Sequence, residues 1–310
     1  MSNRNFEIGL RLQAPQERIR IETWLLLAFV VAVLWGVAGI FSKMSTPNLG
    51  VARVALLIAV VEGIMYSLAY LVWRENVPIG FWDFILAAGS CLIGILGYLC
   101  FFEAIMEGQV AIAGTIAAAY PALSVLGAVL IISEKLTWVQ SIGVVAIIVG
   151  IVSLSYEPHP GSKTAMSGRT LFFALAAFVL WGVWSLTSKL AIDRVGAGNI
   201  FGFYVISAVS APLIYSWFRR VKPAGVAPKN PRRMSWALGA IGLAVNVSGA
   251  YAFSFALEQG LASLVVPISS AYPLVTVVLA IAILKERVSR IQVVPLVVVV
   301  LGLILVGITV

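Results

Sequence analysis

The sequence Leu-Trp-Gly-Val at residues 34–37, followed by Ser-Lys at 42–43, is written again at residues 180–183 and 188–189. Every residue of this pattern returns 146 positions later. The chain therefore contains one unit twice, and both copies lie in strongly apolar sequence. Internal repeats of hydrophobic segments are typical of membrane transporters, which bind their cargo between the repeats.

A second pattern repeats in the same order. Ala-Tyr-Pro at residues 119–121, followed by Glu134, returns 152 positions later as Ala-Tyr-Pro at 271–273 and Glu286. The offset has thus grown by six residues between the two patterns. We expect the insertion in residues 219–233, which are rich in Pro, Lys and Arg and predict an irregular loop.

The composition excludes an ordinary soluble domain, because 61% of the residues are hydrophobic, 11% are charged and the mean hydropathy is +1.03. A bilayer core about 30 Å thick requires roughly 20 apolar residues per helix. The chain supplies ten such runs, five in each copy, near residues 24–46, 49–73, 82–104, 110–132, 138–156, 170–191, 199–218, 234–257, 262–284 and 290–309. The sequence therefore predicts an all-α membrane protein of ten transmembrane helices.

Five helices per copy is an odd number, so the second copy must enter the membrane from the side opposite to the first. The ten helices are then two inverted five-helix repeats related by a pseudo-twofold axis in the membrane plane. We expect a polar N-terminal segment at residues 1–22, a first repeat at 23–156, a linker at 157–169 and a second repeat at 170–310. Residues 1–22 are too polar for a cleavable signal peptide.

The net charge of +8 is carried by loops and termini, and we interpret it as contact with lipid headgroups rather than with nucleic acid. No metal site is expected, because Cys91 and Cys100 face opposite sides of one helix and the only histidine, His159, lies in the polar linker. Cofactor motifs are missing as well: there is no Gly-rich phosphate loop and no H-E-x-x-H. The expected partners are a small-molecule substrate and membrane lipids, with the chain a monomer or a homodimer.

Taken together, the repeated residues resemble the drug/metabolite transporter superfamily, and within it the EamA-type ten-helix transporters. The resemblance rests on Trp-Gly…Lys in the first helix of each unit, Tyr-Pro in the fourth helix and Glu after it, and it covers residues 23–309. It implies transport, location in the cell inner membrane and cytoplasmic termini. With cytoplasmic termini, only eight of the 21 Lys and Arg would lie inside. The positive-inside rule therefore prefers the opposite orientation. We expect the orientation of the family, which the charges of the first unit support.

Glu62 is the sharpest single signal, because it lies near the middle of the second run, where a carboxylate costs about 3 kcal/mol or more. Tyr66 and Tyr70 follow four and eight residues later and share its helix face. Glu62 is our candidate for proton or cation coupling. The alternative is a structural carboxylate that holds helices together, and the sequence weighs the two about evenly.

Three tryptophans lie well inside predicted spans: Trp35 and Trp181 in the repeated pattern, and Trp184 in the second copy only. We expect them to bind substrate, since an indole can form the wall of a cavity and stack on aromatic or cationic cargo. Simple packing is the alternative. Gly36 follows Trp35 and would permit close helix contact.

Four further residues complete the predicted substrate-binding set. Glu103 and Tyr98 are expected near the mouth of the cavity, and Asn246 and Tyr251 in the eighth run. For Asn246 the alternative is a hydrogen bond between helices, since a buried amide must find partners. Tyr120-Pro121 and Tyr272-Pro273 predict kinks within the fourth and ninth runs.

The remaining charges have structural explanations. Lys43 and Lys189 lie near helix ends and are expected to extend to the lipid headgroups. Glu134 and Glu286 precede the fifth helix of each unit and are expected to cap helices. Glu258 is expected to be a solvated loop charge.

We therefore predict a secondary transporter, an exporter of a small organic metabolite such as an amino acid, in which two inverted five-helix units rock about a central cavity. The first alternative is proton-coupled transport of cationic drugs or choline-like solutes, favoured if Glu62 faces the cavity. Alternatives of other classes are a lipid-modifying membrane enzyme, disfavoured by the missing catalytic groups, and a scaffold or receptor that transports nothing.

Overall fold

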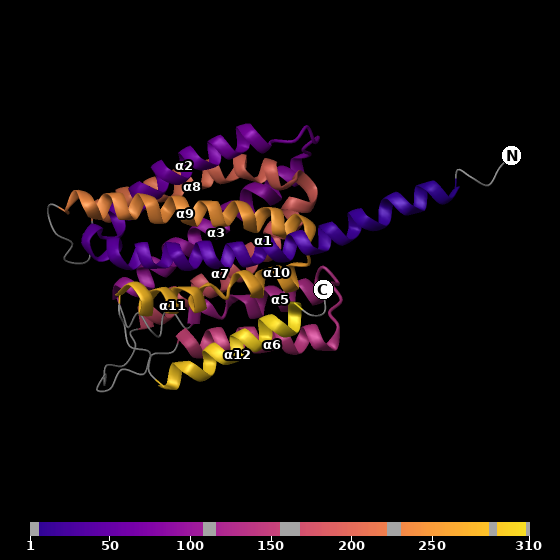
Figure 1. Cartoon of the computed structure of the whole chain (residues 1–310). Helices are drawn as coiled ribbons and strands as arrows, with labels where there is room; N and C mark the ends of the chain where they lie inside the picture. The colour runs from indigo at the N-terminus through magenta and orange to yellow at the C-terminus, as the bar shows by residue number, and fades with distance from the viewer. Residues whose placement is uncertain (1–5, 108–115, 156–167, 222–230, 285–289, 308–310) are drawn as a thin grey trace.

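The computed structural model describes residues 6–107, 116–155, 168–221, 231–284 and 290–307. Within these ranges every regular element is a helix (Figure 1). In chain order the helices are α1 (Phe6–Leu49), α2 (Val51–Trp73), α3 (Phe81–Glu107), α5 (Tyr120–Leu130), α6 (Trp138–Ser155), α7 (Gly168–Val195), α8 (Ala197–Val221), α9 (Arg233–Gln259), α10 (Ala262–Ser269), α11 (Tyr272–Leu284) and α12 (Arg290–Gly307).

The chain is a multi-pass membrane protein. Seven segments of the described residues are helical, long and apolar enough to span a bilayer, and α10 and α11 together form one of them. Three shorter apolar helices, Ile116–Leu130, Trp138–Ser153 and Val293–Gly307, lie at the other three predicted runs. The predicted all-α architecture of two five-helix repeats is therefore confirmed.

The outer faces of the helices are apolar, as contact with lipid requires. On α2, Val60, Ile64 and Leu68 follow one another at intervals of four residues and are each more than half exposed. Glu62 and Tyr66 lie on the opposite, buried face of the same helix. The sequence of α2 thus separates a lipid-facing side from a side that faces the protein.

The Tyr-Pro pairs start helices rather than kink them. In the ninth run, α10 ends at Ser269 and α11 begins at Tyr272, so the break precedes Pro273. In the fourth run, α5 likewise begins at Tyr120 after a turn at Ala119. The prediction of a mid-helix kink was therefore wrong in detail. Proline is favoured in the first helical turn, where its missing N–H has no intrahelical partner to lose.

The two repeats are interlocked, because every large helix interface joins one repeat to the other. Helix α1 packs mainly against α9 and then α11, and its counterpart α7 packs mainly against α3 and then α5 (Figure 1). Helix α2 pairs with α8, and α6 with α12. We call α1, α9, α10 and α11 the first helix group and α3, α5 and α7 the second helix group. Each group mixes helices of both repeats.

The repeated Trp-Gly pair explains how each group is held together. A Cβ added at Gly249 of α9 would lie 2.6 Å from Trp35 Cδ1, and one added at Gly97 of α3 would lie 2.7 Å from Trp181 Cδ1. These two contacts correspond under the repeat. Gly36 likewise meets Val275 of α11 at 2.5 Å. The tryptophan of the pair thus packs onto a glycine of one partner helix. The glycine that follows the tryptophan in the sequence lets a second helix approach.

Two glycine turns mark the two ends of the bundle. Gly50, between α1 and α2, has a φ of 75°, and Gly196, between α7 and α8, has a φ of 86°. They are 146 residues apart, so they are repeat counterparts at opposite ends. A left-handed φ favours glycine, which lacks a Cβ. We call these the Gly50 end and the Gly196 end; α1 begins and α12 ends at the Gly196 end (Figure 1).

Candidate functional site

A cavity of about 840 Å³ lies between the two helix groups. Helices α1, α9 and α11 of the first group and α3, α5 and α7 of the second contribute to its wall, and α2 and α8 complete it. Its volume is in the range of a site for a small organic molecule, about 300–1,000 Å³. The wall thus brings together segments from both repeats that are far apart in sequence.

The cavity reaches toward one end of the bundle only. On α1 its lining runs from Trp35 to Thr46, and on α3 from Gly94 to Phe102, which are the halves of these helices nearer the Gly50 end. On α9 the lining begins at Gly239, again near that end. Around Gly196 the described lining stops at Trp184 of α7 and Tyr204 of α8, and no described residue between these two lines the cavity. The structure therefore represents a conformation that is closed at the Gly196 end.

Glu62 lies on the cavity wall at the centre of α2, eleven residues from either end of the helix. Its side chain is only 4% exposed. Among the described residues, neither a hydrogen bond nor an ion pair of its carboxylate is found, and Glu62 is the only Asp, Glu, Lys, Arg or His on the described wall. A membrane-embedded carboxylate that faces a cavity without a protein partner is suited to bind an ion or a charged cargo.

Ten of the 29 other described lining residues are aromatic. Tyr66 and Tyr204 stack with centroids 4.9 Å apart beside Glu62, and Tyr98 and Tyr120 contact Trp181 with centroids at 6.1 and 5.8 Å. The aromatic lining residues are Trp35, Tyr66, Tyr98, Phe101, Phe102, Tyr120, Trp181, Trp184, Tyr204 and Tyr272. Such rings offer π faces to a cation or to another ring.

The tryptophans are oriented by hydrogen bonds. Trp184 Nε1 donates to the hydroxyl oxygen of Tyr204 at 2.8 Å, and Trp35 Nε1 donates to the backbone carbonyl of Asn246 at 3.2 Å. The ring of Phe253 lies against both indoles, with centroids at 5.3 and 5.4 Å. Their N–H groups are therefore occupied, and the rings present mainly apolar surface to the cavity.

Six of the eight residues predicted for the site line this cavity: Trp35, Glu62, Tyr98, Trp181, Trp184 and Asn246. Their roles in binding and coupling stay predictions. Two expectations of lining were wrong. Glu103 is buried beside the cavity wall, where it accepts a hydrogen bond from the Tyr215 hydroxyl at 2.6 Å and lies 3.8 Å from Arg169. Tyr251 packs instead against Trp73, Phe201 and Tyr66.

Sequence reasoning missed Tyr204 as a wall residue. The sequence shows only that Tyr204 is a tyrosine within an apolar run. Nothing in a single sequence shows that α8 pairs with α2, which is what places Tyr204 on the wall. Tyr66 was noted for sharing a face with Glu62, whereas Tyr120 and Tyr272 were assigned only to kinks. Tyr120 also accepts a hydrogen bond at its hydroxyl from Ser270 at 2.7 Å, which joins the two helix breaks.

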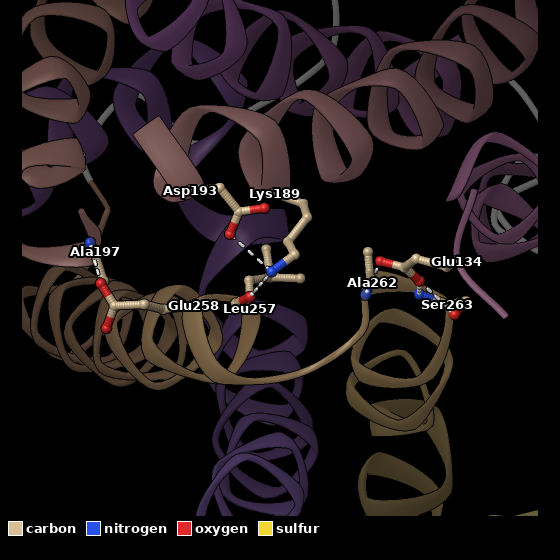
Figure 2. Close-up of polar contacts among 8 residues, drawn as sticks. All are labelled: Glu134, Lys189, Asp193, Ala197, Leu257, Glu258, Ala262 and Ser263. Carbon is tan, nitrogen blue, oxygen red and sulfur yellow. Dashed lines mark hydrogen bonds and ion pairs between the residues drawn. The ribbon is translucent and has the colours of Figure 1, made fainter. Parts of the chain in front are cut away.

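The charges at the Gly196 end differ from their expected roles (Figure 2). Lys189 does not extend to headgroups: its Nζ donates to the carbonyl of Leu257 and to Asp193, both at 2.8 Å. Glu258 is not simply solvated, because its Oε1 accepts the backbone N–H of Ala197 at 2.8 Å. Glu134 does cap a helix, but the helix is α10 of the other repeat.

The described residues contain no group of three or more His, Cys, Asp or Glu that could hold a metal ion. Side chains of Glu107 and Glu286 lie outside the part of the chain whose side chains are described. Lys43, the counterpart of Lys189, is exposed near the Gly50 end.

Comparisons with known proteins agree with this architecture. Residues 22–156 and 168–308 each match the model of the EamA-like transporter family. An uncharacterized protein of Methanocaldococcus jannaschii is 29% identical over 136 residues, which are 44% of this chain and 98% of that protein, about the length of one repeat. A solved crystal structure is similar with a TM-score of 0.74 at 20% identity, over 93% of this chain and 97% of that chain. At this identity it shows the fold alone.

Proposed function

Because the chain belongs to the EamA-like transporter family, we propose that it is a secondary transporter of a small organic cation with an aromatic or apolar body. The family makes it a membrane transporter of the drug/metabolite type. The cargo, the direction and the mechanism are our proposal. The observation that carries it is the chemistry of the wall, where one buried carboxylate stands among aromatic rings.

The sequence suggested an amino acid as cargo, but the charge balance of the wall favours a cation. An amino acid brings a carboxylate as well as an ammonium group. Glu62 would suit the ammonium, but the described wall offers no Lys, Arg or His to the carboxylate, and burial of an unpaired carboxylate is costly. A cation meets both the charge of Glu62 and the faces of the surrounding rings, each of which stabilises it.

The interlocked repeats suggest which parts move. Two five-helix units cannot rock as separate bodies when every large helix interface joins one repeat to the other. The two helix groups are better candidates, because they are pseudo-symmetric and the cavity lies between them. Tilting of one group against the other would close the Gly50 end and open the Gly196 end.

A single carboxylate can also couple the cargo to protons. If Glu62 holds either a proton or the cation, but not both, the exit of one cation is tied to the entry of protons from the other side. We propose export from the cytoplasm across the inner membrane, with both chain ends cytoplasmic. The conformation described above would then be open to the outside.

The test of the cargo class compares two probes with the same ring, tyramine and tyrosine, which differ by the carboxylate. Binding to the purified protein is measured by isothermal titration calorimetry, and flux is measured in proteoliposomes. We expect tyramine to bind at least about tenfold more tightly than tyrosine, because an unpaired buried charge costs 1.4 kcal/mol or more. Equal or tighter binding of tyrosine would contradict the proposal.

The role of Glu62 is tested with two matched variants. Glu62→Gln should weaken tyramine binding about tenfold or more, because a charge-assisted contact contributes about 1.5–3 kcal/mol. It should abolish accumulation driven by a pH gradient, while tyramine exchange persists at high concentration. Glu103→Gln, which changes a buried carboxylate outside the wall, should leave binding unchanged. A Glu62→Gln protein that retains wild-type dependence on the pH gradient would refute the coupling role.

A further inference from the structure

At the Gly196 end, charged side chains satisfy backbone groups at the ends of helices. Glu134 lies in the turn after α5, where Ser133 adopts a φ of 63° and Glu134 N donates to the Ala128 carbonyl at 3.0 Å. This turn points the carboxylate at the beginning of α10 (Figure 2). Glu134 is only 9% exposed, so its carboxylate depends on hydrogen bonds from the protein rather than from water.

The first turn of α10 has no side-chain cap of its own, since the residue at its N-cap is Leu261. Glu134 supplies the cap: Oε1 accepts the N–H of Ala262 at 2.9 Å, and Oε2 accepts the N–H of Ser263 at 2.8 Å and its hydroxyl at 2.5 Å. A carboxylate is favoured at a helix N-terminus by the free N–H groups and by the helix dipole. A residue of the first repeat thus completes a helix of the second.

Lys189 of α7 makes the complementary contact a few residues earlier. Its Nζ donates to the carbonyl of Leu257 in the last turn of α9, where carbonyls lack intrahelical donors. Asp193 accepts a second bond from the same ammonium, whose side chain is 13% exposed. A cation is favoured at a helix C-terminus for the same reason that an anion is favoured at the N-terminus.

Both contacts join the second helix group to the first. Glu134 follows α5 and Lys189 belongs to α7, and both act on the turn between α9 and α10. We propose that Glu134 and Lys189 together clamp the α9–α10 turn, and that release of this clamp opens the cavity at the Gly196 end. The inference rests on the proposed alternation between two conformations, but it is independent of which cargo is carried.

Ser254 offers a reporter of opening at this end. It lies on α9 between the cavity and the clamped turn, and it is 3% exposed. Its counterpart in the first repeat, 152 residues earlier, is Phe102, which lines the cavity toward the Gly50 end. In the pseudo-symmetric opposite conformation, position 254 should therefore face the cavity. A Ser254→Cys substitution is nearly isosteric and becomes reactive only when that end opens.

The experiment uses the full chain in proteoliposomes, with Cys91 and Cys100 replaced by alanine and Cys introduced at position 254. The rate of labelling by a membrane-impermeant maleimide applied at the Gly196 end is measured. Glu134→Gln and Lys189→Met should each raise this rate about tenfold or more, because each removes a charge-assisted contact that stabilises the closed end. Glu258→Gln is the matched control, since Glu258 caps α8 at the same end without joining the two groups.

Three results would overturn the clamp: unchanged labelling in both variants, an equal increase in Glu258→Gln, or a rise limited to variants with a collapsed unfolding temperature. Ser263→Ala removes one donor to Glu134 and provides a milder variant if Glu134→Gln does not fold; it should raise labelling to a smaller extent. The outcomes separate the two proposals. Unchanged labelling with intact tyramine flux refutes the clamp alone, whereas absent flux of every cation in the unmodified chain refutes the proposed function.

Discussion

The contact between Gly97 and Trp181 allows a sharp test of how the repeated Trp-Gly pair builds the second helix group. In Gly97→Ala, the new Cβ would lie 2.7 Å from Trp181 Cδ1, 2.9 Å from its Nε1 and 3.3 Å from Leu180 Cβ. Carbon atoms in contact prefer about 3.5–4.0 Å. The indole must therefore move by most of an ångström, or α3 must move away from α7.

The expected cost follows from two opposing effects. Overpacking of a tight interface destabilises by about 1–3 kcal/mol, whereas replacement of Gly by Ala inside a helix stabilises by about 1 kcal/mol. Gly89→Ala on the same helix isolates the second effect, since a Cβ at Gly89 meets nothing within 4 Å. Gly97→Ala should thus be less stable than Gly89→Ala by about 1–3 kcal/mol.

The assay is thermal unfolding of the detergent-purified variants, in which about 2 °C corresponds to each kcal/mol for a chain of this size. Trp181→Phe in the Gly97→Ala background should recover part of the loss, because phenylalanine lacks the edge of the indole that the new methyl group meets. Tyramine binding should also weaken in Gly97→Ala, since Trp181 lines the cavity. Equal unfolding temperatures for Gly97→Ala and Gly89→Ala would refute the reasoning.

Two further predictions concern the ends of the bundle. Gly50→Ala and Gly196→Ala should each lower the free energy of unfolding by about 1–2 kcal/mol, because φ values of 75° and 86° are strained for alanine; alanine variants as stable as the unmodified protein in thermal unfolding would contradict this. Arg194→Gln should cost less than about 1 kcal/mol, because the pair with Asp83, at 3.2 Å, leaves the Arg194 side chain 67% exposed. The difference should vanish in about 1 M salt, and a larger cost that persists there would indicate a buried role.

The sequence was sufficient for the architecture because the signals for it are local or periodic. Apolar run length predicts spans, and the repeated Trp35 and Trp181 patterns predict two copies. Counting of helices then predicts the inversion. Glu62 could also be identified from sequence as a candidate functional residue, because a carboxylate at the centre of an apolar run is unfavourable unless it has a function or a partner.

Helix pairing was the part that sequence reasoning could not supply, and the errors follow from it. Lys189 near a helix end looks like a residue that extends to lipid until Leu257 of α9 is known to lie beside it. Glu103 and Tyr251 carry the right chemistry at the right depth but face neighbouring helices rather than the cavity. Glu134 was correctly assigned to capping, yet its partner α10 is 128 residues away.

The symmetry of the wall is broken in a compensating way. Trp184 of α7 packs over Gly94 of α3, where an added Cβ would lie 2.6 Å from the indole. Their counterparts in the other helix group are Ala38 and Asn246, by the same offsets of 146 and 152. In the second helix group the large Trp184 thus lies opposite a glycine. At the corresponding positions of the first group, the small Ala38 is paired with the larger Asn246. All four line the cavity, so both sides remain filled while their chemistry differs.

Glu62 has no acidic counterpart, since position 208 of the second repeat is the buried Ala208. In the proposed mechanism, this asymmetry would still allow the same cargo to be held in both conformations. Helices α2 and α8 pair mainly with each other and belong to neither helix group. A carboxylate at the centre of α2 is equally distant from both ends of the helix, and in the proposed movement it would stay in place while the groups tilt around it. One charge at the midpoint can therefore serve both open states, whereas a charge on a moving group would be displaced with it.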